Sequence, residues 1–491
     1  MITIYRRILC LDHSGTISPA MLVTMVKQLA RALANHLNAY AVVVEPGGGT
    51  NFYKPGSVTN LGTLGSMNDV MTQADIEYGA PVDPIMVHFL VIDHPLLDPF
   101  LGATGLTFDV VTPLISYADK FLPLPLTITS RVSASGRAMP AIMLPSSTSG
   151  NAGTVRFYSI DDGWNAQNPP ERDACRIRFT PTQVNAAAAE ADWANVNSAT
   201  KATFERWART VAWKRVGISI SGGGASCFRL VPLFEELEAK GVPIDLMTGV
   251  SGGTIFSACY ALGGLPKVQQ LANRGSSFMV ALLGGLVTSW FVQRYVDDFL
   301  HNCGVCNTEI RVLPISARIA PMSPPQATAV VDGTFGEALR ASGGAPFFGP
   351  YYDGNARQTD GAVLAGLPPP FLAEQFGADI VFAMNVLALP ANRFPGETVP
   401  ILGDIVSVFY RYTPLGRVID TFGATSTMLH TLSEGAGLSA DVFVDSPPRD
   451  WAPVEEFLLY NSTTYSNIGL GLGVDIAAVA QDCKNLWQAL P

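Results

Sequence analysis

Short apolar runs and longer amphipathic runs alternate along the C-terminal part of the chain. The apolar runs RVGISI, IDLMTGV and ADIVFAMNVLAL have the length and the β-branched content of buried strands. Between the strands lie segments with helical periodicity, FRLVPLFEELEAKG and GTIFSACYALGG. Strands that alternate with helices predict an α/β fold with a central, mostly parallel sheet.

The N-terminal part opens with the same kind of alternation. A strand-like ITIYRRILCL is followed by a helix-like AMLVTMVKQLARALANHL and a second strand-like run, AYAVVVE. The triplet Gly47–Gly49 predicts a turn, because no helix carrying a phosphate-binding lysine follows it. The polar stretch LPSSTSGNAGTV predicts an exposed loop. We therefore expect an additional N-terminal α/β domain, whose residues carry no chemical motif.

An alanine-rich, periodic region between Thr182 and Arg215 predicts a helix that bridges the two parts. A chain of 491 residues exceeds the usual size of one domain, so two domains are the expectation. We place the boundary near residue 190, which predicts domains over residues 1–190 and 191–491.

Composition narrows the classes of function. Hydrophobic residues make up 48% of the chain and charged residues only 15%, which indicates large cores or a surface that meets lipid. The net charge of −10, without a long Lys/Arg run, argues against a nucleic-acid partner, because phosphate binding needs a concentrated basic surface. Nothing in the composition predicts the oligomeric state.

Seven cysteines in so long a chain indicate a reducing compartment and not a disulfide framework. Cys303 and Cys306 form a single CxxC pair without a second pair or neighbouring histidines, so we expect no metal and no cofactor. The first residues contain too short an apolar run for a secretory signal. These features predict a cytoplasmic protein that could attach peripherally to membranes.

The longest apolar run, Phe278–Val292, is shorter than the roughly 20 residues that span a bilayer, and it contains two adjacent glycines, Gly284 and Gly285. It predicts a buried helix, or a flap or wall beside an apolar substrate.

One serine has the sequence context of a nucleophile. Gly249, Ser251 and Gly253 form a G-x-S-x-G motif between a predicted strand and a predicted helix. In a nucleophile elbow the serine occupies a sharp, strained turn, and glycines flank it because side chains there would collide with neighbouring backbone. The amides at the start of the following helix also favour developing negative charge.

A glycine loop and an acidic residue complete the predicted site. Gly222, Gly223 and Gly224 follow a strand upstream of the serine, where backbone N–H groups can stabilise an oxyanion. A serine nucleophile needs a proton acceptor, and the downstream histidines, His301 and His430, stand in no recognisable context.

Asp360 precedes the apolar AVLAGL, and burial can raise the pKa of a carboxylate until it serves as a base. Asp332 and Asp353 are also followed by glycine and remain alternatives for the base.

These elements together resemble the patatin-like phospholipase family. Five segments follow the order of that family's pattern within about residues 212–390: SGGGA, GVSGGTIFSACYALGG, ALRASGGAPFFGPYY, DGAV and GADIVFAMNV. The chain departs from the pattern after the glycine triplet, where Ser226 and Cys227 stand in place of a basic residue and a glycine, and the first arginine is Arg229. It also lacks the asparagine usual after the Asp-Gly pair.

The resemblance implies a three-layer α/β fold and a lipid acyl hydrolase of the phospholipase A type, acting on a lipid or membrane-surface substrate through an acyl-enzyme. In this sequence it implies that Ser251 is the nucleophile, Asp360 the base and Gly222–Gly224 the oxyanion loop. Two alternatives stay open: an α/β-hydrolase triad of Ser251, Asp360 and His430, and an inactive relative with a binding or structural role.

Overall fold

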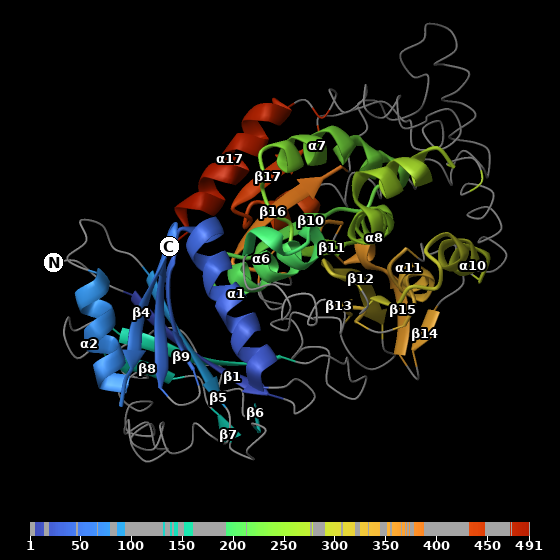
Figure 1. Cartoon of the computed structure of the whole chain (residues 1–491). Coiled ribbons are helices and arrows are strands. Elements are labelled where there is room, and N and C mark those ends of the chain that lie inside the picture. The colour runs from blue at the N-terminus through green and yellow to red at the C-terminus, as the bar shows by residue number, and fades with distance from the viewer. Residues whose placement is uncertain are drawn as a thin grey trace, which may run out of the picture. The chain divides into compact units, whose positions relative to one another are not determined.

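The structure is a computed structural model of the whole chain (Figure 1). It describes residues 5–13, 19–45, 48–65, 67–78, 86–93, 131–132, 138–139, 142–145, 152–160, 193–212, 214–274, 277, 290–305, 308–319, 325–331, 333–343, 351–353, 356–364, 366–368, 370, 373, 378–386, 432–446, 472 and 474–490.

The chain divides into two compact units, Met1–Trp213 with Pro491, and Lys214–Leu490. The division falls after the alanine-rich helix α6 (Ser198–Ala212), later than the boundary near residue 190 that the composition predicts. Helix α6 packs against α1 (Pro19–Leu37) within the first unit, since its apolar face needs a partner there.

The first unit is built around a seven-stranded mixed sheet in the order β4-β3-β2-β5-β1-β9-β8. Strands β1, β2, β5 and β9 pair in parallel, whereas β3, β4 and β8 add antiparallel pairs at the two edges. The elements are β1 (Tyr5–His13), α1, β2 (Tyr40–Val44), β3 (Gly49–Lys54), β4 (Ser57–Thr63), α2 (Met67–Tyr78), β5 (Met86–Asp93), β8 (Ile142–Pro145), β9 (Ala152–Ile160), the short 3₁₀ helix η3 (Trp193–Asn195) and α6, with β6 (Arg131–Val132) and β7 (Ala138–Met139) paired separately.

One loop predicted in this unit overlaps strands at both of its ends. The segment expected to be an exposed loop, residues 144–155, begins within β8 and ends within β9. Its ends are extended because β9 pairs with both β8 and β1, so tertiary pairing overrides the turn-forming composition. Residues 146–151 lie outside the described residues.

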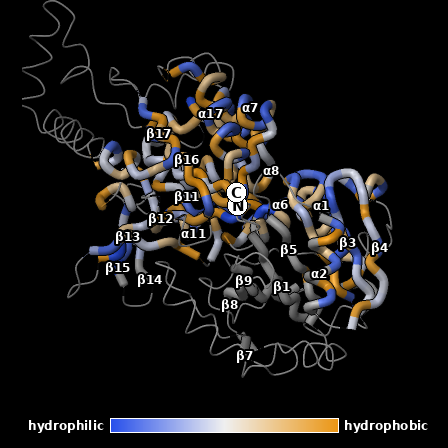
Figure 2. Tube along the Cα trace, turned by 90° about the vertical axis from the view of Figure 1, so that its left-hand side faces the viewer, coloured by the Kyte–Doolittle hydropathy of each residue, from blue (hydrophilic) through white to orange (hydrophobic). Residues whose placement is uncertain are grey.

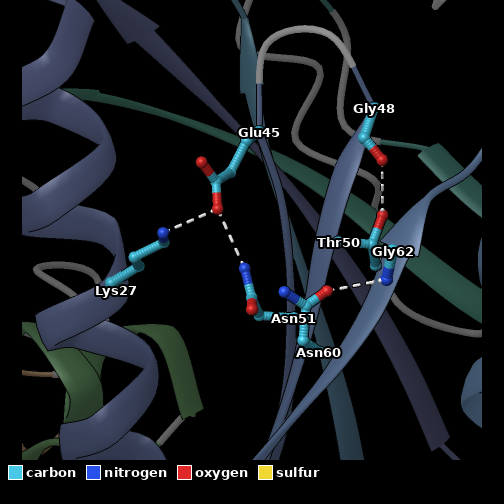
Figure 3. Close-up of polar contacts among 7 residues, drawn as sticks. All are labelled: Lys27, Glu45, Gly48, Thr50, Asn51, Asn60 and Gly62. Carbon is cyan, nitrogen blue, oxygen red and sulfur yellow. Dashed lines mark hydrogen bonds and ion pairs between the residues drawn. The ribbon is translucent and has the colours of Figure 1, made fainter.

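Polar contacts hold the turn between β2 and β3, where the glycine triplet predicts one (Figure 3). The amide of Gly48 donates to the carbonyl of Glu45 at 2.9 Å, and the hydroxyl of Thr50 donates to the carbonyl of Gly48 at 3.0 Å. The Glu45 carboxylate accepts from the Asn51 side chain at 2.8 Å and pairs with Lys27 of α1 at 2.7 Å. The ion pair therefore links the end of β2 to α1.

The second unit contains an eight-stranded sheet whose main path runs β14-β15-β12-β11-β10-β16-β17, with β13 paired to β12. Its elements are β10 (Val216–Ile220), the 3₁₀ helix η4 (Gly224–Leu230), α7 (Val231–Ala239), β11 (Leu246–Gly249), α8 (Gly252–Ala272), α10 (Trp290–Phe299), β12 (Arg311–Ile319), β13 (Gln326–Ala329), α11 (Phe335–Ser342), β14 (Tyr351–Asp353), β15 (Ala356–Asp360), η6 (Gly361–Val363), β16 (Ile380–Asn385), β17 (Val442–Asp445) and α17 (Ile476–Ala489).

Five strands of this sheet are parallel to their neighbours: β12, β11, β10, β16 and β17. Strands β13, β14 and β15 are antiparallel additions at one side. The predicted α/β fold with a mostly parallel central sheet is therefore confirmed. The chain moves from β10 to β11 on one side and returns to β16 on the other, and ligand sites of open α/β sheets lie at the carboxyl ends of strands beside such a reversal.

The core of the second unit lies around the central strands. Every residue of β10, β11 and β16 is buried, as expected for parallel strands covered by helices. Apolar residues of α7, α8 and α17 join these strands in one buried cluster. Figure 2 shows the hydrophobic positions gathered at β11 and β16. This packing makes the strand ends rigid supports for the loops that follow them.

Candidate active site

Ser251 occupies a strained turn between β11 and α8. Its backbone has φ 50° and ψ −115°, a conformation that non-glycine residues adopt only when surrounding structure enforces it, at a cost of roughly 1–3 kcal/mol. The turn closes through a hydrogen bond from the amide of Gly253 to the carbonyl of Val250 at 2.8 Å. Ser251 is half-buried, so part of its side chain reaches the surface.

The flanking glycines are a steric requirement. A Cβ at Gly249 would lie 2.5 Å from the carbonyl carbon of Gly253, and one at Gly253 would lie 2.6 Å from the carbonyl oxygen of Ile220. A Cβ at Gly252 would lie 2.5 Å from the carbonyl oxygen of Gly224. Backbone atoms cannot yield to such contacts, so the G-x-S-G-G pattern follows from the geometry of the turn.

The glycine loop lies directly beside the serine. Strands β10 and β11 pair in parallel with Ile220 opposite Gly249, so the loops after both strands emerge at the same sheet edge. Gly223 and Gly224 have φ values of 152° and 56°, which glycine adopts without strain. A Cβ at Gly222 would be 3.5 Å from the Cβ of Ser251. The loop therefore contacts the serine, as the sequence predicts.

The amide of Gly222 is already engaged, because it donates to the carbonyl of Gly366 at 2.9 Å. The preceding residue, Ser221, donates its amide to the carbonyl of Met384 at 3.0 Å, and its hydroxyl accepts from the amide of Val386 at 2.8 Å. These bonds fix the start of the loop against β16.

Asp360 ends β15 and faces Ser251. Its Oδ1 accepts the amide of Ala362 at 2.9 Å, which caps η6, and the residue is 8% exposed. Burial raises the pKa of Asp360 to about 6, and hydrogen bonds from the Ala362 amide and the Ser251 side chain lower it in part. The serine side chain therefore lies close enough to the carboxylate to influence its pKa, although the two residues are far apart in the sequence.

A hydroxyl cluster supports the back of the serine turn. The backbone amide of Ser251 donates to Ser342 Oγ at 3.1 Å, and Ser342 Oγ lies 2.8 Å from Thr254 Oγ1. Ser342 donates to the carbonyl of Ile315 on β12 at 2.6 Å, while Thr254 donates to the carbonyl of Gly249 at 2.9 Å. Ser342 is the last residue of α11, and its buried side chain connects three elements.

The region after the glycine triplet is buried. Ser226 and Cys227, which stand where the resemblance places a basic residue and a glycine, are buried, and Arg229 is buried as well. Burial raises the pKa of the Cys227 thiol, while the nearby charge of Arg229 lowers it in part. A positive charge therefore lies close to Cys227, three residues beyond Ser226, the position where the resemblance places a basic residue.

The structure does not place the other residues named from the sequence beside Ser251. Asp353 ends β14, where only its backbone is described, and Asp332 and His430 lie outside the described residues. His301 is exposed just after α10. The Cys303 thiol donates to the carbonyl of Gly304 at 3.5 Å, and its CxxC partner, Cys306, lies outside the described residues.

The predicted apolar flap is described only at its end. Residues 278–289 lie outside the described residues, whereas Trp290, Phe291 and Val292 begin α10. Trp290 and Phe291 are each 45% exposed, and Val292 is buried.

Alignments with curated proteins identify relatives of this arrangement. The lysophospholipase NTE1 of Phaeosphaeria nodorum is 26% identical over 228 residues, which are 43% of this chain and 14% of that protein. The lysophospholipase nte1 of Aspergillus fumigatus is 27% identical over 256 residues, which are 49% of this chain and 15% of that protein. The chain is a distant homologue of these patatin-domain lysophospholipases. It spans about one seventh of their length.

Family models and solved structures were also compared with the chain. No protein-family model matches the chain. Among solved structures, VipD from Legionella pneumophila is 10% identical with a TM-score of 0.28, and the match covers 56% of this chain and 67% of VipD.

No described helix combines the length and apolarity needed to cross a membrane, and no cluster of His, Cys, Asp or Glu with metal-binding geometry occurs among the described residues.

Sequence reasoning singled out Ser251, Asp360 and the glycine loop, but it missed Ser342, Thr254 and the carbonyl of Gly366. Ser342 lies in ALRASGG, one of the quoted segments, yet the segment itself does not reveal its partner. Only the packing of α11 against β12 and α8 brings its hydroxyl to the serine turn.

Proposed function

We propose that the second unit is a lipid acyl hydrolase in which Ser251 is the nucleophile and Asp360 the general base. The observation that carries this proposal is the proximity of the strained Ser251 to a buried carboxylate, whose pKa is raised to about 6 by burial and lowered in part by the serine side chain. A base with that pKa is ionised at neutral pH, yet it binds a proton far more readily than an ordinary aspartate.

The proposed reaction has two half-reactions. Asp360 accepts the Ser251 hydroxyl proton while Oγ attacks the ester carbonyl, and the tetrahedral intermediate then expels the leaving alcohol, which receives that proton. In the second half-reaction Asp360 takes a proton from water, which attacks the acyl-enzyme and releases the fatty acid. The serine regains its proton, so the enzyme returns to its initial state.

The oxyanion requires donors that are not otherwise engaged. Because the Gly222 amide donates to Gly366, we assign the oxyanion donors to Gly223 and Gly224, with Gly222 positioning the loop against the serine. Losing one such donor costs roughly 2.7–4 kcal/mol of transition-state stabilisation. We further propose that the second unit has the three-layer patatin-like fold that the resemblance implies, which its mostly parallel central sheet supports.

The substrate we propose is a phospholipid or lysophospholipid ester at a lipid surface. The NTE1 relatives are named lysophospholipases, which supports a lipid substrate. The exposed rings of Trp290 and Phe291 begin a helix that packs beside α11, and aromatic rings are typical of surfaces that meet lipid. The phospholipase A-type activity of the unit is part of the proposal.

A fluorophosphonate probe tests the proposal directly, because it reacts with activated serines. We expect labelling of the full chain, loss of labelling in Ser251→Ala, and retention in Ser439→Ala, which makes the same change at an exposed serine. A folded wild-type protein that neither reacts with the probe nor cleaves a soluble ester would favour the alternative of an inactive binding protein.

A further inference from the structure

Ser342 Oγ makes polar contacts with three residues of the second unit, and we call this set of contacts the Ser342 junction. It accepts from the Ser251 amide, donates to the Ile315 carbonyl and contacts Thr254 Oγ1, at 3.1, 2.6 and 2.8 Å. The side chain is fully buried, so water cannot replace these partners without rearrangement.

The proton count orients this hydroxyl. Ser342 has one proton, and its shortest contact, with the Ile315 carbonyl, takes it. A lone pair of Oγ is then available to the Ser251 amide, which is a donor only. The Thr254 proton is shared between Ser342 Oγ and the Gly249 carbonyl. The oxygen of Ser342 is therefore held as an acceptor toward the backbone of the serine turn.

The Ile315 carbonyl connects the junction to the proposed base. Ile315 precedes Ser316, which pairs with Asp360 across β12 and β15. A Cβ at Gly361 would collide with that same carbonyl oxygen, so the backbone after Asp360 packs directly against Ile315. One hydroxyl thus joins the backbone of the nucleophile to the strand that supports the base.

We propose that Ser342 is a positioning residue, which holds the Ser251 backbone in its strained conformation so that the serine hydroxyl stays within hydrogen-bonding reach of Asp360. This inference rests on the proposed function of Ser251 and Asp360. Gly343 adds a second restraint, since a Cβ at that position would lie 3.6 Å from the Ser251 Cα. The end of α11 therefore supports the serine from behind.

The test compares Ser342→Ala with Ser219→Ala. Ser219 is an equally buried serine of β10 that donates to the Pro368 carbonyl at the same 2.6 Å and accepts from Thr248 at 3.0 Å, without contacting Ser251. We expect Ser342→Ala to lower kcat on a soluble ester by roughly 10- to 100-fold with KM nearly unchanged, because small displacements of reacting groups cost that much. Ser219→Ala should retain kcat.

The pH profile separates positioning from a general loss of stability. If the serine hydroxyl moves away from Asp360, the hydrogen bond that lowers the pKa of that carboxylate weakens, so the acidic limb of kcat/KM shifts to higher pH. Ser342→Cys matches the volume but accepts hydrogen bonds weakly, and it should resemble Ser342→Ala. Ser342→Thr keeps the hydroxyl and should restore part of kcat.

The outcomes are distinguishable. Equal kcat values and pH profiles for folded Ser342→Ala and Ser219→Ala would overturn the positioning role while leaving the hydrolase intact. If Ser342→Ala does not fold, Ser342→Cys carries the same comparison, and a Cys variant with wild-type kcat and pH profile likewise overturns it. An inert wild-type chain would instead refute the proposed function on which the inference rests.

Discussion

The substitution Asp360→Asn replaces one carboxylate oxygen with an amide nitrogen, and it should change activity and stability in opposite directions. Asparagine is nearly isosteric with aspartate and keeps an acceptor for the Ala362 amide, which donates to Asp360 at 2.9 Å. It cannot take up the serine proton. We expect kcat on a soluble ester to fall by at least ~10² to 10⁴, the range for general acid–base catalysis, while the fold persists.

The same change should stabilise the protein. Burial raises the pKa of Asp360 from its ordinary 3.8 to about 6, and each unit of pKa corresponds to about 1.4 kcal/mol. The ionised side chain therefore destabilises the folded state by up to roughly 3 kcal/mol, a penalty that asparagine lacks. A residue that lowers stability while serving the reaction is typical of functional sites.

The sign of the pH dependence follows from linkage. Between about pH 4 and pH 6 the folded state binds more protons at Asp360 than the unfolded state, so wild-type stability declines as pH rises through that window. The stability advantage of Asp360→Asn should be absent at pH 4 and complete above about pH 7. Activity of the wild type should rise over the upper part of the same window, because the base must be ionised.

The assay pairs urea unfolding at pH 4 and pH 8 with kcat measurements at pH 8. Because two compact units can unfold in separate steps, the comparison uses the transition that the substitution moves. Asp353→Asn is the matched control, an Asp-Gly aspartate on the neighbouring strand. A folded Asp360→Asn protein that retains most of its activity would exclude this base, and Asp353 and Asp332 would then be tested.

Three further predictions concern the same mechanism and its substrate. Ser251→Ala should abolish turnover, and combining it with Asp360→Asn should be barely worse than either change alone, because the two residues act as one unit; additive losses in kcat would contradict this. His430→Ala should leave turnover near normal, whereas a collapse of several orders of magnitude would favour the triad. Leu282→Asp or Leu283→Asp should depress hydrolysis of long-chain esters more than of short-chain ones, because burying an unpaired charge in an apolar groove costs several kcal/mol. Equal losses on both kinds of ester would indicate misfolding.

The sequence by itself determined the parts of this protein that depend on neighbouring residues. The serine turn was predictable because the contacts that exclude a Cβ at Gly249, with Gly253 and Thr254, lie within the turn itself. The strands β10, β11 and β16 were predictable because full burial produces continuous apolar runs.

The local signals failed where pairing with a distant strand decided the structure. Residues 144–155 have a loop-like composition, yet their ends join β8 and β9, because β1 and β8 provide hydrogen-bonding partners to β9. The compact units divide after α6, because packing against α1 places that helix in the first unit.

Only the tertiary structure decided which groups around Ser251 touch. The order β15-β12-β11-β10 places Asp360 opposite Ser316 of β12, close to the ends of β11 and β10, so Asp360, the glycine loop and the serine lie near one another. It also decided that the Gly222 amide is engaged and that Ser342 supports the turn. These are contacts between residues about 30 to 165 positions apart, and their partners follow from strand order and helix packing, which no local pattern of residues encodes.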